Sequence, residues 1–195
     1  MRSLPRTTPT PRAVRLGGTA AVFAGLCYGA AGYLDRPGVS GYTAVLVSVL
    51  SVAVPALFLA GLLGLHARLP LAARTSLTGG AGFVVGCFGA VLGTVGALGS
   101  ARIPYVEMTE WWRVLFLAGL TVMGLVAASS KGGLRLLGAV VSISGALGWV
   151  SLLTDPAFSG GLVPMRPVHV AFAAAFCLSS VVWGSALMVP YNGGR

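Results

Sequence analysis

The sequence predicts an all-α membrane protein, a bundle of six transmembrane helices with both termini in the cytoplasm. Hydrophobic residues make up 56% of the chain and charged residues only 9%, whereas a soluble domain carries about 25% charged residues. Six apolar segments are each long enough to cross a bilayer core as a helix, which takes about 20 residues. These segments are residues 17–34, 42–65, 77–98, 111–128, 134–153 and 168–189. The third observation is how charge is distributed between them.

The excess of positive charge lies on one side of the segments. The N-terminal tail, the second and fourth gaps and the C-terminus contain cations and no acid: Arg2, Arg6, Arg12, Arg15, Arg68, Arg74, Lys131, Arg135 and Arg195. The other gaps, with the adjoining start of the fourth segment, are neutral overall: Arg36, Arg102, Arg113 and Arg166 balance Asp35, Glu107, Glu110 and Asp155. The positive-inside rule therefore predicts cytoplasmic termini.

Composition and charge also indicate where the protein is located and what it contacts. Arg far outnumbers Lys, and Ala, Gly and Val are abundant, which is typical of a GC-rich bacterial genome and predicts a multi-pass protein of the bacterial inner (cell) membrane. Because the basic residues lie in short loops and tails beside spans, they indicate a lipid bilayer and no nucleic acid. A membrane protein partner or a homo-oligomer is the other expected association.

The N-terminal region is predicted to be a tail followed by a retained span. Residues 1–15 contain four Arg and three Pro without an apolar period, which predicts a disordered basic cytoplasmic tail. The transmembrane domain is expected over residues 16–190, and residues 191–195 form a short cytoplasmic tail. The first segment reaches Asp35 without an Ala-x-Ala-like cleavage site, so we expect it to span the membrane rather than act as a signal peptide.

The second segment carries Pro55 near its middle. The missing amide of this proline frees the carbonyl of Ser51 and favours a kink, and the hydroxyl of Ser51 or Ser48 is expected to help satisfy the backbone. Pro55 is therefore a hinge candidate; the alternative is a tolerated bend.

The third segment carries a glycine stripe at alternating steps of three and four: Gly79, Gly82, Gly86, Gly89, Gly93 and Gly96. A stripe without side chains permits close contact between helices in lipid, so this segment is predicted to be the central helix. Shorter stripes of small residues make the first and sixth segments its expected neighbours: Gly18, Ala21, Gly25, Gly29, Gly32, Ala173, Cys177, Ser180 and Gly184.

Polar candidates for chemistry gather at the predicted outer face, namely Glu107, Glu110, Asp155 and His169. Carboxylates and imidazole suit a divalent cation or acid and base catalysis, although the spacing is not diagnostic and no residue is assigned as catalytic. The alternative is that these groups are interfacial charges that pair with nearby arginines, for example Glu110 with Arg113.

Three cysteines lie inside predicted spans, Cys27, Cys87 and Cys177, so no disulfide is expected. Converging thiols would suit a soft metal such as Cu(I), and the alternative is three separate buried thiols. No cofactor is predicted. No ionisable residue lies in the middle of a span, which argues against a proton-coupled transporter.

The string Gly61-Leu62-Leu63-Gly64-Leu65-His66-Ala67-Arg68, followed by a short basic loop and the glycine-rich span, resembles uncharacterised six-span membrane proteins of actinobacteria and related bacteria. This resemblance covers about the middle third of the chain; it implies a six-helix fold and no particular activity. Three functions remain open: a non-enzymatic membrane protein that binds a partner or a hydrophobic ligand, a small permease, and an outer-face membrane enzyme.

Overall fold

The computed structural model describes residues 11–34, 41–99, 106–155 and 166–189, and in these ranges the chain is helical with no strand. The elements are α1 (Pro11–Leu34), α2 (Tyr42–Arg68), α3 (Leu71–Thr75), α4 (Leu77–Gly99), α5 (Val106–Ala128), α6 (Gly133–Leu153) and α7 (Arg166–Met188). All but α3 are long and apolar enough to cross a membrane. The predicted class, a six-helix all-α bundle, is confirmed.

Two helix boundaries differ from the expectation, and one short helix was not predicted. Helix α1 begins at Pro11, so the last residues of the predicted tail are helical, and residues 1–10 lie outside the described ranges. Helix α5 begins at Val106 and includes Glu107 and Glu110, which were expected in the preceding loop. The short helix α3 was not predicted, because five residues are too few to show a hydrophobic period.

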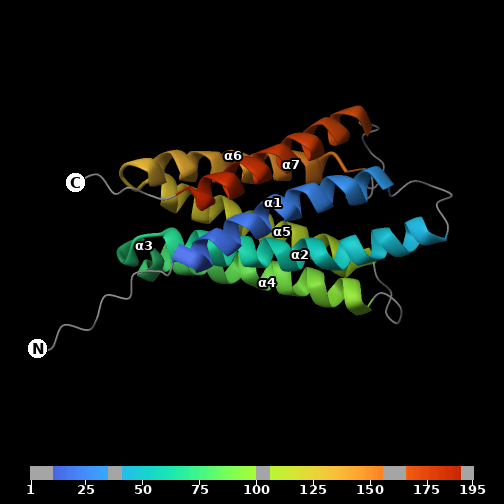
Figure 1. The fold of residues 1–195 in the computed structure, drawn as a ribbon, viewed down its shortest axis with the longest axis horizontal. Helices are drawn as coiled ribbons and strands as arrows, with labels where there is room; N and C mark the ends of the chain where they lie inside the picture. The colour runs from blue at the N-terminus through green and yellow to red at the C-terminus, as the bar shows by residue number, and fades with distance from the viewer. Residues whose placement is uncertain (1–10, 35–40, 100–105, 156–165, 190–195) are drawn as a thin grey trace, which may run out of the picture.

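The six long helices form a closed ring in the order α1, α2, α4, α5, α6 and α7, and α7 packs back against α1. Figure 1 shows that α1 begins and α7 ends at the same end of the bundle, together with α3. We call this the termini end, and the opposite end, where α1 ends and α2 begins, the distal end. The expected central position of the third span is wrong: α4 is a member of the ring and packs against α5 and α2.

The inside of the ring is filled with large apolar side chains. Phe58 of α2 meets Phe116 of α5 and Phe176 of α7, with ring centroids 4.7 and 5.7 Å apart. Other fully buried side chains are Leu62, Leu65, Leu120, Met123, Val141 and Trp183. These groups come from α2, α5, α6 and α7 and form one continuous apolar core.

Glycines allow neighbouring backbones in the ring to touch. A Cβ atom on Gly17 of α1 would lie 2.5 Å from the Cα atom of Gly64 in α2, and one on Gly89 of α4 would lie 2.5 Å from the amide nitrogen of Phe116. Gly86 of α4 and Gly119 of α5 face each other in the same way. Such close approach gains van der Waals contact, which is a main source of helix association in lipid.

The small-residue stripes of the first and sixth spans pack against each other rather than against the third span. A Cβ atom on Gly18 of α1 would lie 2.6 Å from the carbonyl oxygen of Gly184 in α7, and one on Gly25 would lie 2.8 Å from that of Cys177. The neighbours expected for the third span were therefore wrong, because a small-residue face can accept any helix of matching shape.

Helix α2 is packed along only its second half. Its buried residues begin at Val54, and Pro55 lies in a continuous helix beside Gly93 and Trp112. The hydroxyl of Ser51 donates to the Val47 carbonyl at 2.9 Å and that of Ser48 to the Ala44 carbonyl at 3.0 Å. The expectation that one of these hydroxyls donates to the Ser51 carbonyl is therefore wrong. Each hydroxyl donates instead to the carbonyl four residues before it.

Substituting Gly89 by Ala tests the close contact between α4 and α5. The new Cβ atom would meet backbone atoms of Phe116 and Trp112, which no side-chain rotation can relieve, so we expect a loss of about 1–3 kcal/mol of stability. The measurement is the thermal unfolding midpoint of the purified protein in detergent.

Gly96→Ala is the matched control on the same helix. Gly96 is also buried, but no atom of the described residues lies within 4 Å of its Cβ position. This variant should keep the unfolding midpoint or raise it slightly, because Ala favours a helix over Gly by about 1 kcal/mol. Equal destabilisation by both variants would contradict the contact.

Candidate functional site

An ion pair joins α5 and α6 at the distal end. The Arg113 Nη1 atom lies 2.8 Å from the Asp155 Oδ2 atom, and the two side chains are only 19% and 15% exposed. Arg113 is two turns into α5, and Asp155 directly follows the last turn of α6, where its amide donates to the Leu152 carbonyl. A carboxylate at a helix C-terminus is unfavourable for the helix dipole, so the arginine offsets that cost. Pairing of the outer-face carboxylates with nearby arginines was expected, with Glu110 and Arg113 as the example. The structure shows the pair of Asp155 with Arg113, and the side chain of Glu110 lies outside the described part of the chain.

Tyr28 of α1 brings a third helix to this pair. Its ring meets Phe176 edge to face with centroids 5.6 Å apart, and its phenol interacts with Arg113 and Asp155. The indole of Trp112, the residue before Arg113, lies against Gly93 and near Phe116. Tyr28 therefore connects the ion pair to Phe176, which belongs to the apolar core.

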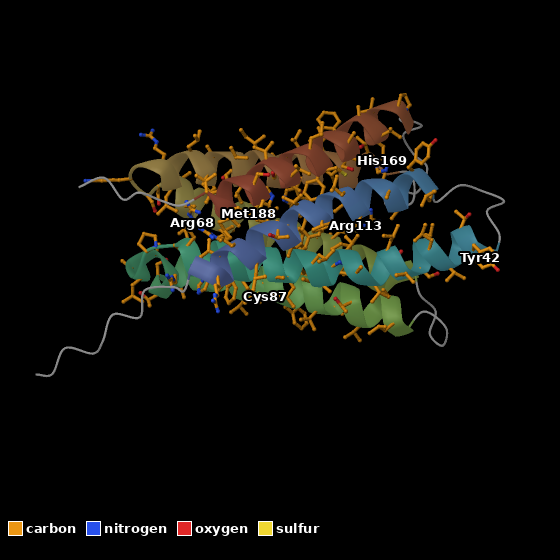
Figure 2. The ribbon with its side chains drawn as sticks, in the orientation of Figure 1. Tyr42, Arg68, Cys87, Arg113, His169 and Met188 are labelled. Atoms are coloured by element: carbon orange, nitrogen blue, oxygen red, sulfur yellow. The ribbon has the colours of Figure 1, made fainter. Side chains whose placement is uncertain are left out.

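His169 holds α7 against α6 beside this pair. Its Nδ1 atom lies 2.9 Å from the carbonyl oxygen of Ser151, in the last turn of α6. This carbonyl belongs to the group that a helix C-terminus leaves without an intrahelical partner, so the imidazole serves as a cap. Figure 2 places Arg113 and His169 on the distal half of the bundle.

We define the distal polar cluster as Tyr28, Arg113, Ser151, Asp155 and His169. Of the outer-face residues predicted from sequence, Asp155 and His169 belong to it, and each contacts a protein partner. Glu107 and Glu110 lie in the first turns of α5, and their side chains are outside the part of the structure that is described. The cluster links α1, α5, α6 and α7 by charge and hydrogen bonding.

The cysteines do not meet. Cys177 of α7 lies near Gly29 of α1, and Cys87 is on α4, which packs against neither of those helices to any extent. Across the described ranges, no three His, Cys, Asp or Glu side chains form a group that could hold a metal ion. Convergence of all three thiols between the first, third and sixth spans is therefore wrong, since the third span, α4, does not pack substantially against α1 or α7.

Two arginines at the termini end have roles that sequence analysis missed. Arg68 Nη1, at the end of α2, donates to the carbonyls of Leu187 and Val189 at the end of α7, at 2.6 and 3.0 Å. Arg74 of α3 donates to the carbonyls of Leu69 and Ala67, both at 2.6 Å. Cations at helix C-termini satisfy orphan carbonyls and complement the helix dipole. The signal available in the sequence was a basic residue in the last turn of a span.

His66 also lies at the termini end, where its ring stacks on that of Phe83 with centroids 3.9 Å apart. This stacking joins α2 to α4 close to Arg68 and Arg74. The contact of His66 in the structure is therefore with an aromatic ring.

Comparison with protein-family models, curated proteins and solved structures finds no match for this chain. Inference about function therefore rests on the structure itself. Among the described residues, the charged groups lie at the two ends of the bundle, and a packed, mainly apolar core lies between them.

Neutralising one member of the Arg113–Asp155 pair tests its contribution. Arg113→Gln leaves the Asp155 carboxylate without its ion-pair partner, and Asp155→Asn leaves the Arg113 guanidinium without its partner. For a fully buried pair such a change lowers the free energy of unfolding by about 3–5 kcal/mol, and the loss is smaller here because both side chains are partly exposed. We expect a lower unfolding midpoint for each single variant, measured in detergent at constant pH.

The charge swap Arg113→Asp with Asp155→Arg provides the matched comparison. If the pair itself stabilises the bundle, the double variant should recover part of the loss of the single variants. Single variants with the midpoint of the parent protein would show that the pair contributes nothing to stability.

Proposed function

We propose that this chain is a non-enzymatic integral membrane protein that binds an apolar partner, namely a transmembrane helix of a membrane protein or of a second copy. The observation that carries this proposal is the filled core. Phe58, Phe116 and Trp183 are at most 1% exposed, so the middle of the ring is occupied by apolar groups. A path for a polar solute requires polar or hydrated lining, and a binding role requires only an outer surface.

The first half of α2, residues 42–53, is the surface proposed to contact the partner. None of its residues is buried, and Val45, Leu46 and Val49 are 62%, 46% and 58% exposed. The hydroxyls of Ser48 and Ser51, three residues apart, are also exposed on this segment. Small and hydroxyl-bearing residues are enriched where transmembrane helices meet, which favours a helix over lipid as the occupant.

A photo-crosslinking residue at position 45 tests this surface in intact membranes. We expect illumination to join the protein to one partner of defined mass, because the side chain at this position points away from the bundle at the distal half of α2. The matched control is position 170 of α7, since Val170 is 63% exposed and also lies near the distal end.

Equal products from positions 45 and 170 would contradict the proposal, since both surfaces would then contact the same lipid environment. A small permease is the second candidate, favoured by the Arg113–Asp155 pair, because ionisable groups within spans commonly mark solute pathways. Solute uptake into vesicles made with the purified protein, abolished by Asp155→Asn, would replace the binding proposal with this one.

We further infer that the termini end faces the cytoplasm of a bacterial cell. The one-sided distribution of cations supports this orientation through the positive-inside rule, and the resemblance to six-span bacterial proteins supports the host. In a variant with Cys27, Cys87 and Cys177 replaced by Ala, a single cysteine at Gly41 should react with a membrane-impermeant maleimide on intact cells.

A single cysteine at Thr75 is the matched position, since Gly41 and Thr75 are both exposed and lie at opposite ends of the bundle. It should react only after the cells are opened. Labelling of position 75 but not position 41 on intact cells would reverse the proposed orientation.

A further inference from the structure

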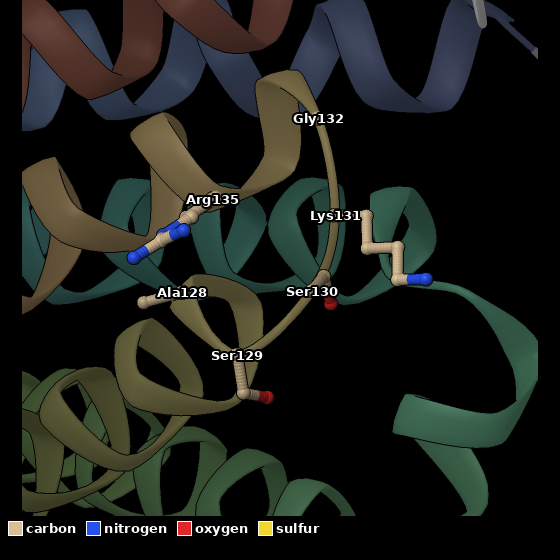
Figure 3. Close-up of a pocket in the computed structure, with 6 residues that line it drawn as sticks. All are labelled: Ala128, Ser129, Ser130, Lys131, Gly132 and Arg135. Carbon is tan, nitrogen blue, oxygen red and sulfur yellow. The ribbon is translucent and has the colours of Figure 1, made fainter.

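A depression of about 410 Å³ lies at the termini end, between the last turn of α5 and the first turn of α6. It is lined by Ala128, Ser129, Ser130, Lys131, Gly132 and Arg135. Gly132 adopts φ +70°, a left-handed conformation that lets the chain reverse tightly between the two helices. Figure 3 shows the side chains of Lys131 and Arg135 flanking this depression.

Within the described part of the chain, neither the Lys131 nor the Arg135 side chain forms a hydrogen bond or an ion pair with another residue. Lys131 and Arg135 are exposed, whereas the neighbouring hydroxyls of Ser129 and Ser130 donate to the Val126 carbonyl at 2.8 and 3.4 Å. Arg68 and Arg74, at the same end, are engaged by carbonyl groups. The cationic groups of this depression are therefore available to an anion from outside the chain.

No acidic side chain competes for these cations within the described part of the chain. Glu107 and Glu110 lie near the start of α5 and Asp155 follows α6, so all three are at the distal end, about a helix length away. A helix of about 20 residues extends about 30 Å, which is several Debye lengths at physiological ionic strength. The local field at the depression is consequently that of uncompensated positive charge.

The surface below the depression is apolar. Leu125 precedes Ser129 by one helical turn on α5 and is 59% exposed, and Leu136, the residue after Arg135, is 71% exposed. Ile143 continues the exposed apolar surface of α6 two turns further into the span. Two cations above an apolar strip match a lipid, which has a charged headgroup on apolar chains, better than a free anion.

We propose that this depression binds the phosphate headgroup of an anionic phospholipid, with Lys131 and Arg135 contacting the phosphate and the acyl chains lying along Leu125, Leu136 and Ile143. Because the depression is at the end of two spans, it lies at headgroup depth when these helices cross a bilayer. Basic sites between transmembrane helices are a recurrent means of recognising anionic headgroups.

The test is native mass spectrometry of the detergent-purified full chain titrated with phosphatidylglycerol, and separately with phosphatidylcholine that carries the same acyl chains. We expect the parent protein to retain phosphatidylglycerol preferentially. Lys131→Gln with Arg135→Gln should weaken that binding about thirtyfold, since each cation near an anionic headgroup contributes about a fivefold factor. Both side chains are exposed, so the fold should tolerate the change.

Arg12→Gln with Arg15→Gln is the matched control, because it removes the same charge from two exposed side chains at the same end. It should weaken phosphatidylglycerol binding by less than about fivefold if the depression is the site. Equal loss in both double variants would show a diffuse field and overturn the proposal.

Two further outcomes would also overturn it. Equal retention of phosphatidylglycerol and phosphatidylcholine would show that the headgroup charge is not recognised. If millimolar inorganic phosphate displaces phosphatidylglycerol, the depression binds a free phosphate rather than a lipid. A melting curve of each variant with phosphatidylcholine alone separates loss of the site from loss of the fold.

Discussion

Close backbone contact between helices is the constraint on which the rest of this structure depends. In lipid, the hydrophobic effect does not drive one apolar helix against another, so association relies on packing and on the few polar groups available. The contacts of Gly17 with Gly64 and of Gly86 with Gly119 bring two pairs of neighbours in the ring, α1 with α2 and α4 with α5, within backbone distance. That spacing leaves an interior that three phenylalanine rings and Trp183 can fill.

Carbonyls at helix C-termini, which have no partner within their own helix, are satisfied by different side chains at the two ends of the bundle. At the termini end, Arg68 and Arg74 donate to carbonyls at the ends of α7 and α2. At the distal end, His169 contacts the Ser151 carbonyl of α6, while Arg113 is used for Asp155. In each case a side chain from one helix fixes the end of another, so these contacts position helices that the glycine contacts bring together.

The sequence was sufficient for the class and for the number of spans, because an apolar run of about 20 residues has few alternatives to a membrane helix. It was not sufficient for the neighbours of each helix. A glycine stripe specifies a face that can be approached closely, and α4 meets α5 and α2 rather than the helices expected. Pairing of outer-face carboxylates with arginines was expected, but the sequence did not specify that Asp155 pairs with Arg113, since the two residues are 42 positions apart.

The filled core also determines where a function can be located. With mainly apolar side chains in the middle of the ring and the described charged groups at its ends, the surfaces left for recognition are the lipid-facing sides and the two ends. The distal charges whose contacts are described neutralise each other as Arg113 and Asp155, whereas Lys131 and Arg135 at the termini end have no acidic side chain nearby among the described residues. Positive charge that is uncompensated within the chain can be compensated by the anionic leaflet. Binding of its lipids would therefore stabilise the bundle and fix its orientation through the same residues.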